Sequence, residues 1–240
     1  MRPKVICHMI SSIDGRLHPD RWTEPVDGID KDALLGCYEQ VAEQFNADGW
    51  LVGRKTMGYY AKGGPISAKT ATADLRSSFV VDRGSRGVAI TVDPQGKLHY
   101  KPDDAAKDHF ITILSEHVSD QYLAELQQKN ISYLFAGKDG KDLAKAMETL
   151  GEEFAIKTIL LEGGGLINGA FLKAGLIDEI SLLIYPGIDS LAGVASIFEY
   201  IGKADEQPAQ GQSLRHIASK DLDHGMVWLR YQVQKNNHSV

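Results

Sequence analysis

The stretch Ile156-Lys-Thr-Ile-Leu-Leu-Glu162-Gly-Gly-Gly165-Leu-Ile-Asn-Gly-Ala-Phe-Leu-Lys-Ala-Gly175 decides the fold. Its first apolar run is short and rich in isoleucine and leucine, which is typical of a strand buried on both faces. After Glu162 and three glycines, apolar residues recur at helical spacing, at Ile167, Ala170, Phe171 and Ala174. Gly175 stands where a left-handed C-terminal cap belongs. The stretch therefore predicts a strand, a glycine turn and a helix.

The glycines between the predicted strand and helix indicate a phosphate site. Because they carry no Cβ, an anion can approach the free N–H groups at the helix N-terminus. A tight turn that needs a positive φ angle would explain one glycine, but three in a row after Glu162 favour binding. The stretch lacks the ordinary dinucleotide fingerprint, since Asn168 occupies the place of its third glycine, and the chain has no P-loop.

Length and composition favour one globular domain over residues 1–240. Hydrophobic residues make up 43% and charged residues 24%, which excludes a disordered or fibrous chain. A net charge of −6 and a pI near 5.7 argue against a general nucleic-acid binder. Cys7 and Cys37 are expected to be reduced, and the scattered histidines predict no metal site.

The chain shows no sign of a membrane or secretory segment. No apolar run approaches the roughly 18 to 20 residues of a spanning helix. The N-terminal Met1-Arg-Pro-Lys lacks a signal-peptide core. We therefore expect a cytoplasmic protein that has no membrane partner.

Strand and helix patterns alternate along the chain. Short apolar runs predict strands at 4–12, 48–53, 78–82, 109–114 and 131–135, and helices are predicted after Asp30, after Ser119 and around Leu143. Alternating residues at 226–233 predict an antiparallel C-terminal hairpin with 214–219. The predicted fold class is therefore α/β, with a mostly parallel central sheet, helices on both faces and an antiparallel C-terminal edge hairpin.

Several segments show no period. Residues 62–76 are expected to form a mobile flap, and 235–240 a frayed tail. Trp22 lies in an irregular stretch at 16–29, where it could cover a ligand or plug the edge of the core, and both interpretations stay open.

Charged or glycine residues mark the predicted strand ends. In an open parallel sheet, ligands bind at the carboxyl ends of the strands. Asp14, Gly53, Arg83 and Glu162 all fall at such predicted ends. Arg54, Lys55 and Thr56 beside Gly53 suit phosphate capture, with a solvated surface as the alternative. The pattern predicts a cleft in which cations hold a phosphorylated cofactor and carboxylates hold a substrate.

Taken together, these motifs resemble the dihydrofolate reductase-like superfamily, and within it the pyrimidine reductase domain of riboflavin biosynthesis. The resemblance is carried by Ser11-Ser-Ile-Asp14-Gly-Arg16, Leu51-Val-Gly53-Arg-Lys-Thr56, Val80-Val-Asp82-Arg83, and Leu161-Glu162-Gly-Gly-Gly165 running on to Asp178-Glu179 and Pro186. It implies a dihydrofolate reductase-like fold, NADPH as hydride donor, a small heterocyclic substrate and a homodimer.

The resemblance also implies roles for single residues. Gly53, Arg54 and Thr56 match positions for the cofactor phosphates, and Arg83 matches the adenosine end, where a cation favours the 2′-phosphate of NADPH. The loop and helix start under the diphosphate correspond to Gly163, Gly164, Gly165, Leu166, Ile167 and Asn168. Ser12, Asp14 and Glu162 match positions that face the substrate.

We therefore expect an NADPH-dependent oxidoreductase of the 5-amino-6-(5-phosphoribosylamino)uracil reductase type. Asp14 is the candidate catalytic residue, as a proton donor if desolvation raises its pKa. The segment Tyr59-Tyr60-Ala-Lys-Gly-Gly-Pro65 departs from the acidic segment that this reductase group usually carries, so the substrate stays open. The alternatives are a dihydrofolate reductase-like enzyme of other substrate and a non-catalytic NADPH-binding protein.

Overall fold

The structure is a computed structural model that describes residues 1–26, 28–67, 74–103 and 107–235. The chain divides into two compact units. Unit 1 comprises Met1–Pro3 and Asp48–Ile159, and unit 2 comprises Lys4–Ala47 and Leu160–Val240. The single domain over residues 1–240 stays a prediction. No helix among the described residues has the length and apolar character needed to cross a membrane.

Parallel strands form the framework of unit 1. In its described residues they lie in the order β5 (Ser132–Phe135), β4 (His109–Leu114), β3 (Val88–Val92) and β2 (Gly49–Gly53). The register pairs Gly53 with Val92 and Val92 with Ile113, so these strands end at a common edge. β6 (Thr158–Leu161) contains residues of both units.

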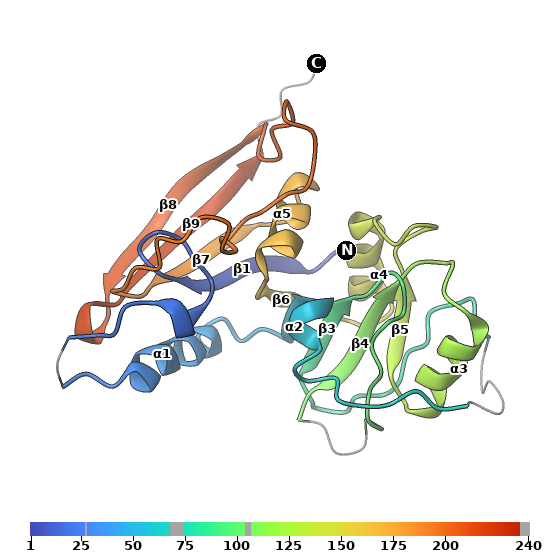
Figure 1. Ribbon diagram of the computed structural model, residues 1–240. Coiled ribbons are helices and arrows are strands. Elements are labelled where there is room, and N and C mark those ends of the chain that lie inside the picture. The colour runs from blue at the N-terminus through green and yellow to red at the C-terminus, as the bar shows by residue number, and fades with distance from the viewer. Residues whose placement is uncertain (27, 68–73, 104–106, 236–240) are drawn as a thin grey trace. The chain divides into compact units, whose positions relative to one another are not determined.

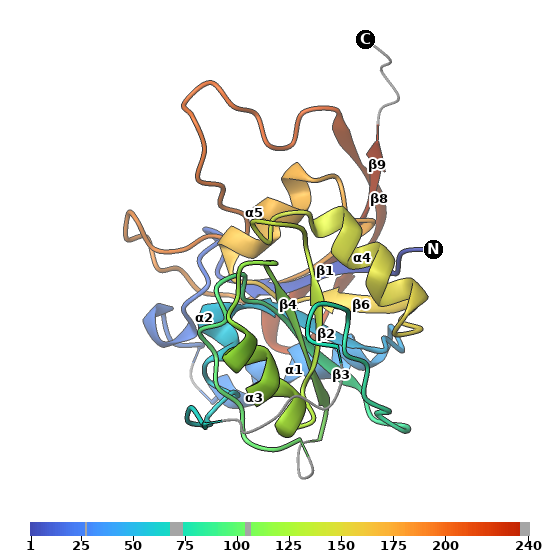
Figure 2. The ribbon, with the colours of Figure 1, turned by 90° about the vertical axis from the view of Figure 1, so that its right-hand side faces the viewer.

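Three helices lie in the described part of unit 1. α2 (Arg54–Met57) follows β2 directly, α3 (Asp120–Gln128) connects β4 to β5, and α4 (Leu143–Glu152) follows β5. Figure 2 shows α3 and α4 as separate helices beside these strands. Ser119 caps α3 as predicted, because its side chain accepts a hydrogen bond from the Tyr122 N–H. Leu123 and Leu126 of α3 are fully buried in the core cluster that also contains Val52 of β2.

Unit 2 combines a parallel strand pair with an antiparallel hairpin. Its strands lie in the order β1 (Lys4–Ser11), β7 (Glu179–Ile184), β9 (Val227–Lys235) and β8 (Gln212–Asp221). β1 and β7 are parallel, whereas β9 is antiparallel to both β7 and β8. Figure 1 shows β8 and β9 as a long hairpin alongside β7. The predicted fold class, with mostly parallel strands and an antiparallel C-terminal hairpin, is confirmed.

Two helices and two short 3-10 turns complete the described part of unit 2. These are α1 (Lys31–Glu43), α5 (Gly165–Lys173), Pro19–Arg21 and Asp223–Gly225. Asp30 caps α1 through a hydrogen bond from the Asp32 N–H. Trp22 is only 3% exposed, and its ring centroid lies 4.9 Å from that of Tyr185. Of its two interpretations, the plug of the core is the one that the structure supports.

One predicted strand is wrong. Residues 78–82 form no strand, and their β-bridge is the isolated pair Phe79 and Tyr133. The strand that pairs with β2 in unit 1 is β3, which follows them in the chain. Both segments are short apolar runs, and periodicity cannot rank such runs against each other. Of the expected flap at 62–76, residues 68–73 lie outside the described residues, as do 236–240 of the expected tail.

Candidate functional site

A cleft opens at the carboxyl edge of the unit 1 strands. Its volume is about 630 Å³, and it is lined by Arg54, Asp93, Pro94, Gln95, Ser115, His117, Val118, Asp139 and Lys141. Arg54 follows β2, Asp93 follows β3 and Ser115 follows β4. This is the edge at which parallel α/β sheets bind ligands. Arg54, His117 and Lys141 give the cleft side chains that can bind an anion.

Asp93 is a fully buried carboxylate in the lining of this cleft. Its Oδ2 accepts hydrogen bonds from the backbone N–H groups of Lys97 at 2.6 Å and Leu98 at 2.8 Å. Within the described residues its Oδ1 has no hydrogen-bond partner, and the nearest cation is Arg54, whose Nε lies 3.8 Å away. Burial raises the pKa of Asp93, against the effect of the backbone N–H groups and Arg54. The cleft therefore combines an unsatisfied buried oxygen with a half-exposed guanidinium, which makes it a candidate ligand site.

The other residues predicted near Gly53 lie at the same edge. Gly53 is the N-cap of α2, and no side chain caps this short helix. Arg54 lines the cleft, whereas Thr56 belongs to α2 but not to the cleft lining. Gly53, Arg54 and Thr56 therefore lie together at the carboxyl end of β2, and of the three only Arg54 is part of the cleft lining.

Arg83 lies at the opposite edge of the same strands. It precedes β3, donates a hydrogen bond to the Arg86 carbonyl, and lies 3.9 Å from Asp48, which precedes β2. Because β2 and β3 are parallel, both positions belong to their amino ends. The expectation that Arg83 stands at a carboxyl strand end is wrong, since it depended on the strand at 78–82.

The glycine loop of unit 2 contains three glycines that serve different purposes. Gly163 has a φ of +87°, in the region that favours glycine. Gly164 is the N-cap of α5, and a Cβ there would meet no heavy atom within 4 Å. A Cβ on Gly165 would lie 2.1 Å from the carbonyl oxygen of Ser196. In this loop, Gly163 therefore forms the turn, Gly164 leaves the backbone accessible, and Gly165 allows close packing against Ser196.

The first turn of α5 contains the remaining predicted cofactor residues. Leu166 is 46% exposed and Ile167 is partly buried. Asn168 is fully buried, and its Nδ2 donates to the Ile197 carbonyl at 2.8 Å. Within the described residues no side-chain cap is found at the N-terminus of α5, whose N-cap is Gly164, so the first N–H groups of the helix suit an anion.

The predicted apolar face of α5 is partly wrong. Ala174 is exposed, and the buried residues of the helix are Gly165, Asn168, Gly169 and Phe171. Glycines occupy that face because the chain at 196–199 packs directly against it. Gly175 has a φ of +63° and ends the helix as predicted.

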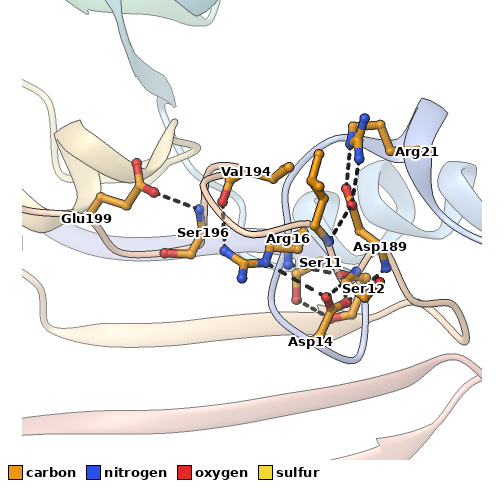
Figure 3. Close-up of polar contacts among 11 residues, drawn as sticks. Ser11, Ser12, Asp14, Arg16, Arg21, Asp189, Val194, Ser196 and Glu199 are labelled. Carbon is orange, nitrogen blue, oxygen red and sulfur yellow. Dashed lines mark hydrogen bonds and ion pairs between the residues drawn. The ribbon is translucent and has the colours of Figure 1, made fainter.

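Asp14 lies in an exposed turn after β1 and accepts several hydrogen bonds. Its Oδ1 accepts from Ser12 Oγ at 2.7 Å and from the Asp189 N–H at 3.1 Å, and its Oδ2 accepts from the Ser190 N–H at 2.8 Å (Figure 3). The hydrogen bond from Ser12, supported by those from the two backbone groups, lowers the pKa of Asp14 to about 2. The raised pKa that a proton donor needs is therefore absent, and that expectation is wrong.

Ser12 and Glu162 are the other two residues predicted to face the substrate. Ser12 is buried and also accepts the Arg16 N–H at 3.0 Å, so its hydroxyl holds the turn. Glu162 follows β6, is partly exposed and is hydrogen-bonded to Tyr38. The pKa of Tyr38 is raised mainly by burial and secondly by the charge of Glu162. Glu162 therefore offers a carboxylate to a ligand at a carboxyl strand end.

Sequence reasoning missed several cleft residues, among them Asp93, Ser115, His117 and Lys141. The apolar run at 88–92 followed by Asp93-Pro94 was the available signal for the first of them. The others come from loops after β4 and β5 and have no motif of their own.

The mostly parallel strands with an antiparallel C-terminal hairpin form a mixed α/β fold of the kind seen in a solved pyrimidine reductase-like protein. The model of the RibD C-terminal domain family matches residues 3–189, and the chain belongs to that family. The resemblance to the pyrimidine reductases of riboflavin biosynthesis is thereby confirmed, and with it the oxidoreductase class.

Known relatives support this assignment. The chain is 26% identical over 194 residues to a 2,5-diamino-6-ribosylamino-4(3H)-pyrimidinone 5′-phosphate reductase of Methanothermobacter thermautotrophicus, covering 78% of this chain and 80% of that protein. A pyrimidine reductase-like protein of Corynebacterium diphtheriae has a TM-score of 0.64 at 19% identity, covering 98% of this chain and 93% of the other. RibD of Acinetobacter baumannii has a TM-score of 0.62 at 20% identity, and the match covers 97% of this chain but 58% of RibD.

Proposed function

We propose that this protein is an NADPH-dependent reductase that transfers a hydride to a phosphoribosylamino-pyrimidine in riboflavin biosynthesis. The observation that carries the proposal is the carboxyl-edge cleft of unit 1, which is lined by Arg54, His117 and Lys141, three side chains that can bind phosphate. Membership of the RibD C-terminal domain family and the relationship to an archaeal pyrimidinone phosphate reductase support it.

The residues present fit a phosphorylated nicotinamide cofactor. In unit 1, Arg54, His117 and Lys141 line the cleft and can pair with phosphate oxygens. Considered separately, the N-terminus of α5 in unit 2, with its open position at Gly164, suits a phosphate that approaches the backbone. When bound, the cofactor supplies the hydride. An extra phosphate gives the cleft cations a partner that NADH lacks, which is why we favour NADPH.

The substrate side of the proposal rests on Glu162. Its partly exposed carboxylate can accept hydrogen bonds from the N–H groups of a pyrimidine and orient the ring. Asp14 remains ionised at neutral pH because its pKa is about 2. We therefore expect solvent to supply the proton that accompanies the hydride.

The direct test is NADPH absorbance in the presence of purified protein and a candidate substrate. The diamino-ribosylamino-pyrimidinone phosphate, its deaminated uracil counterpart and dihydrofolate are compared, each with NADPH and with NADH. We expect oxidation of NADPH with one of the two pyrimidines. NADPH binding without oxidation by any of them would favour the non-catalytic alternative, and absence of binding would contradict the cofactor assignment.

We also propose that the protein is a homodimer. β8 is the outermost strand of the unit 2 order, and Leu214 and Ile217 on it are 55% and 42% exposed. Exposed apolar residues on an edge strand favour pairing with a second copy. Sedimentation equilibrium should give twice the 26.3 kDa mass of one chain, and a monomer at micromolar concentration would contradict the proposal.

A further inference from the structure

We propose that Asp14 is a positioning residue that holds the glycine loop in its binding conformation through residues 186–200, a segment that we call the strap. All the contacts involved lie within unit 2. The identity of the ligand, NADPH, rests on the proposed function, whereas the coupling between Asp14 and the loop does not.

The turn after β1 is hydrogen-bonded to the N-terminal half of the strap. Both oxygens of Asp14 are engaged by strap N–H groups, from Asp189 and Ser190. Further along, the Arg16 Nη1 donates to the Val194 carbonyl at 2.7 Å, and the Leu17 N–H donates to the Ala195 carbonyl at 3.1 Å. Figure 3 shows Asp14 and Arg16 pointing at this part of the strap. Hydrogen bonds that an ionised carboxylate accepts are charge-assisted, and they are stronger than those between neutral groups.

The far end of the strap packs against the glycine loop and the first turn of α5. The Glu199 N–H donates to the Gly165 carbonyl at 3.0 Å, and Asn168 Nδ2 donates to the Ile197 carbonyl at 2.8 Å. A Cβ on Gly169 would lie 1.8 Å from the Glu199 carbonyl oxygen. Through these contacts the strap fixes the position of the N-terminus of α5.

The far half of the strap is held by its own hydrogen bonds and is joined to the turn after β1 at Arg16. The Ser196 N–H donates to Glu199 Oε1 at 3.2 Å, and Ser196 Oγ donates to the Phe198 carbonyl at 2.9 Å, which closes 196–199 into a compact turn. An antiparallel bridge joins Arg16 to Ser196. A displacement at the Asp14 end is thus carried to the residues that touch Gly165 and Asn168.

A second anchor keeps the strap attached when Asp14 is changed. Arg21 donates two hydrogen bonds to the Asp189 carboxylate, from Nε at 2.8 Å and from Nη2 at 2.9 Å. The Ile13 N–H also donates to the Gly187 carbonyl at 2.8 Å. Substitution of Asp14 should therefore loosen the strap without detaching it, and the variant remains folded.

The experiment is Asp14→Asn, with Asp221→Asn on β8 as a matched change of an exposed carboxylate. Hydrogen exchange of the protein without cofactor is expected to be faster at residues 163–168 in Asp14→Asn and unchanged in the control. NADPH affinity, from tryptophan fluorescence, is expected to fall about tenfold. Faster exchange confined to residues 12–17 and 187–191, with unchanged NADPH affinity, would overturn the inference.

A double-mutant cycle with Asn168→Ala tests whether the two ends act through one strap. If they do, exchange at 163–168 in the double variant should be close to that of the more affected single variant. Additive effects would mean independent contacts and would overturn the inference. Should the wild-type protein fail to bind NADPH, the proposed function falls, and the exchange data still decide the coupling.

Discussion

The two edges of the parallel strands in unit 1 carry similar polar residues that are used differently. At the amino edge, Asp103 Oδ2 accepts from Arg86 Nη2 at 2.8 Å and lies 2.5 Å from His109 Nδ1, while His109 Nε2 lies 2.7 Å from Ser132 Oγ. At the carboxyl edge, Asp93 Oδ1 has no hydrogen-bond partner within the described residues. The first edge is a closed network, and the second is an open cleft.

The comparison shows what distinguishes a binding site from a structural cluster. Asp103, His109 and Ser132 have the order of a hydrolytic triad, yet they are only 3%, 1% and 0% exposed. The Val81 N–H also donates to Ser132 Oγ at 2.9 Å. No substrate can reach that hydroxyl, so the network stabilises the fold. Polar residues at strand ends indicate a candidate site where they line an open cleft, as Arg54, His117 and Lys141 do at the carboxyl edge.

The largest effect is expected for Asp103→Ala. Removing this buried carboxylate leaves Arg86 without its ionic partner and should lower the free energy of unfolding by about 3 kcal/mol. NADPH affinity of the folded protein should change little, because the cleft lies at the other edge. Urea denaturation measures the first quantity and fluorescence titration the second. If Asp103→Ala instead bound NADPH much more weakly and kept the stability of the wild type, the two edges would not differ in function as we describe.

Arg54→Ala should have the reverse pattern. We expect NADPH affinity to fall about tenfold through loss of a phosphate contact, and stability to change by less than about 0.5 kcal/mol because Arg54 is half-exposed. Titration with NADPH and NADH compares the two cofactors, and the loss should be greater for NADPH. An equal loss for both would assign Arg54 to a phosphate that the cofactors share.

The pH dependence of stability should reveal Asp14. Its pKa falls from 3.8 to about 2 on folding, so its stabilising contribution is present above the unfolded value and is lost as the pH falls toward 2. The stability difference between wild type and Asp14→Asn should therefore be constant near neutral pH and shrink below about pH 4. Urea midpoints measured from pH 7 to pH 3 provide the check. If the stability difference between wild type and Asp14→Asn grew as the pH fell, the hydrogen bonds that Asp14 accepts could not be stabilising its ionised form.

The smallest effect is expected for Arg83→Gln, the matched control for Arg54. Its ion pair with Asp48 spans 3.9 Å near the surface, which is worth less than about 0.5 kcal/mol. NADPH affinity should be unchanged, since Arg83 lies at the amino edge. A selective loss of NADPH affinity would instead support the adenosine role that the sequence resemblance implied.

Sequence patterns were sufficient where local chemistry decides the structure. The caps at Asp30 and Ser119, the break at Gly53 and the end of α5 at Gly175 each follow from one residue and its neighbours. The strand β3 was missed because residues 78–82 are an equally apolar run. Arg83 was misplaced as a direct consequence.

Other features depend on residues far apart in the chain. The unsatisfied oxygen of Asp93 becomes evident only when β2 and β3 bring Arg54 beside it. Gly165 and Asn168 look like parts of a phosphate motif, but their surroundings include the strap, about thirty positions further along. No local pattern contains that contact, so the packing role of these residues could not be predicted.

The different purposes of the three loop glycines imply unequal tolerance to natural variation. Alanine at Gly164 should leave folding intact, because its Cβ would point into open space, and should obstruct the phosphate that we propose binds there. At Gly165 the same change should prevent folding, since the Ser196 carbonyl occupies the place of the methyl group. Gly163 should accept only residues that adopt its positive φ. Among related sequences, we therefore expect the residue at position 164 to change with the ligand that is bound, and positions 163 and 165 to be restricted by the stability of the fold.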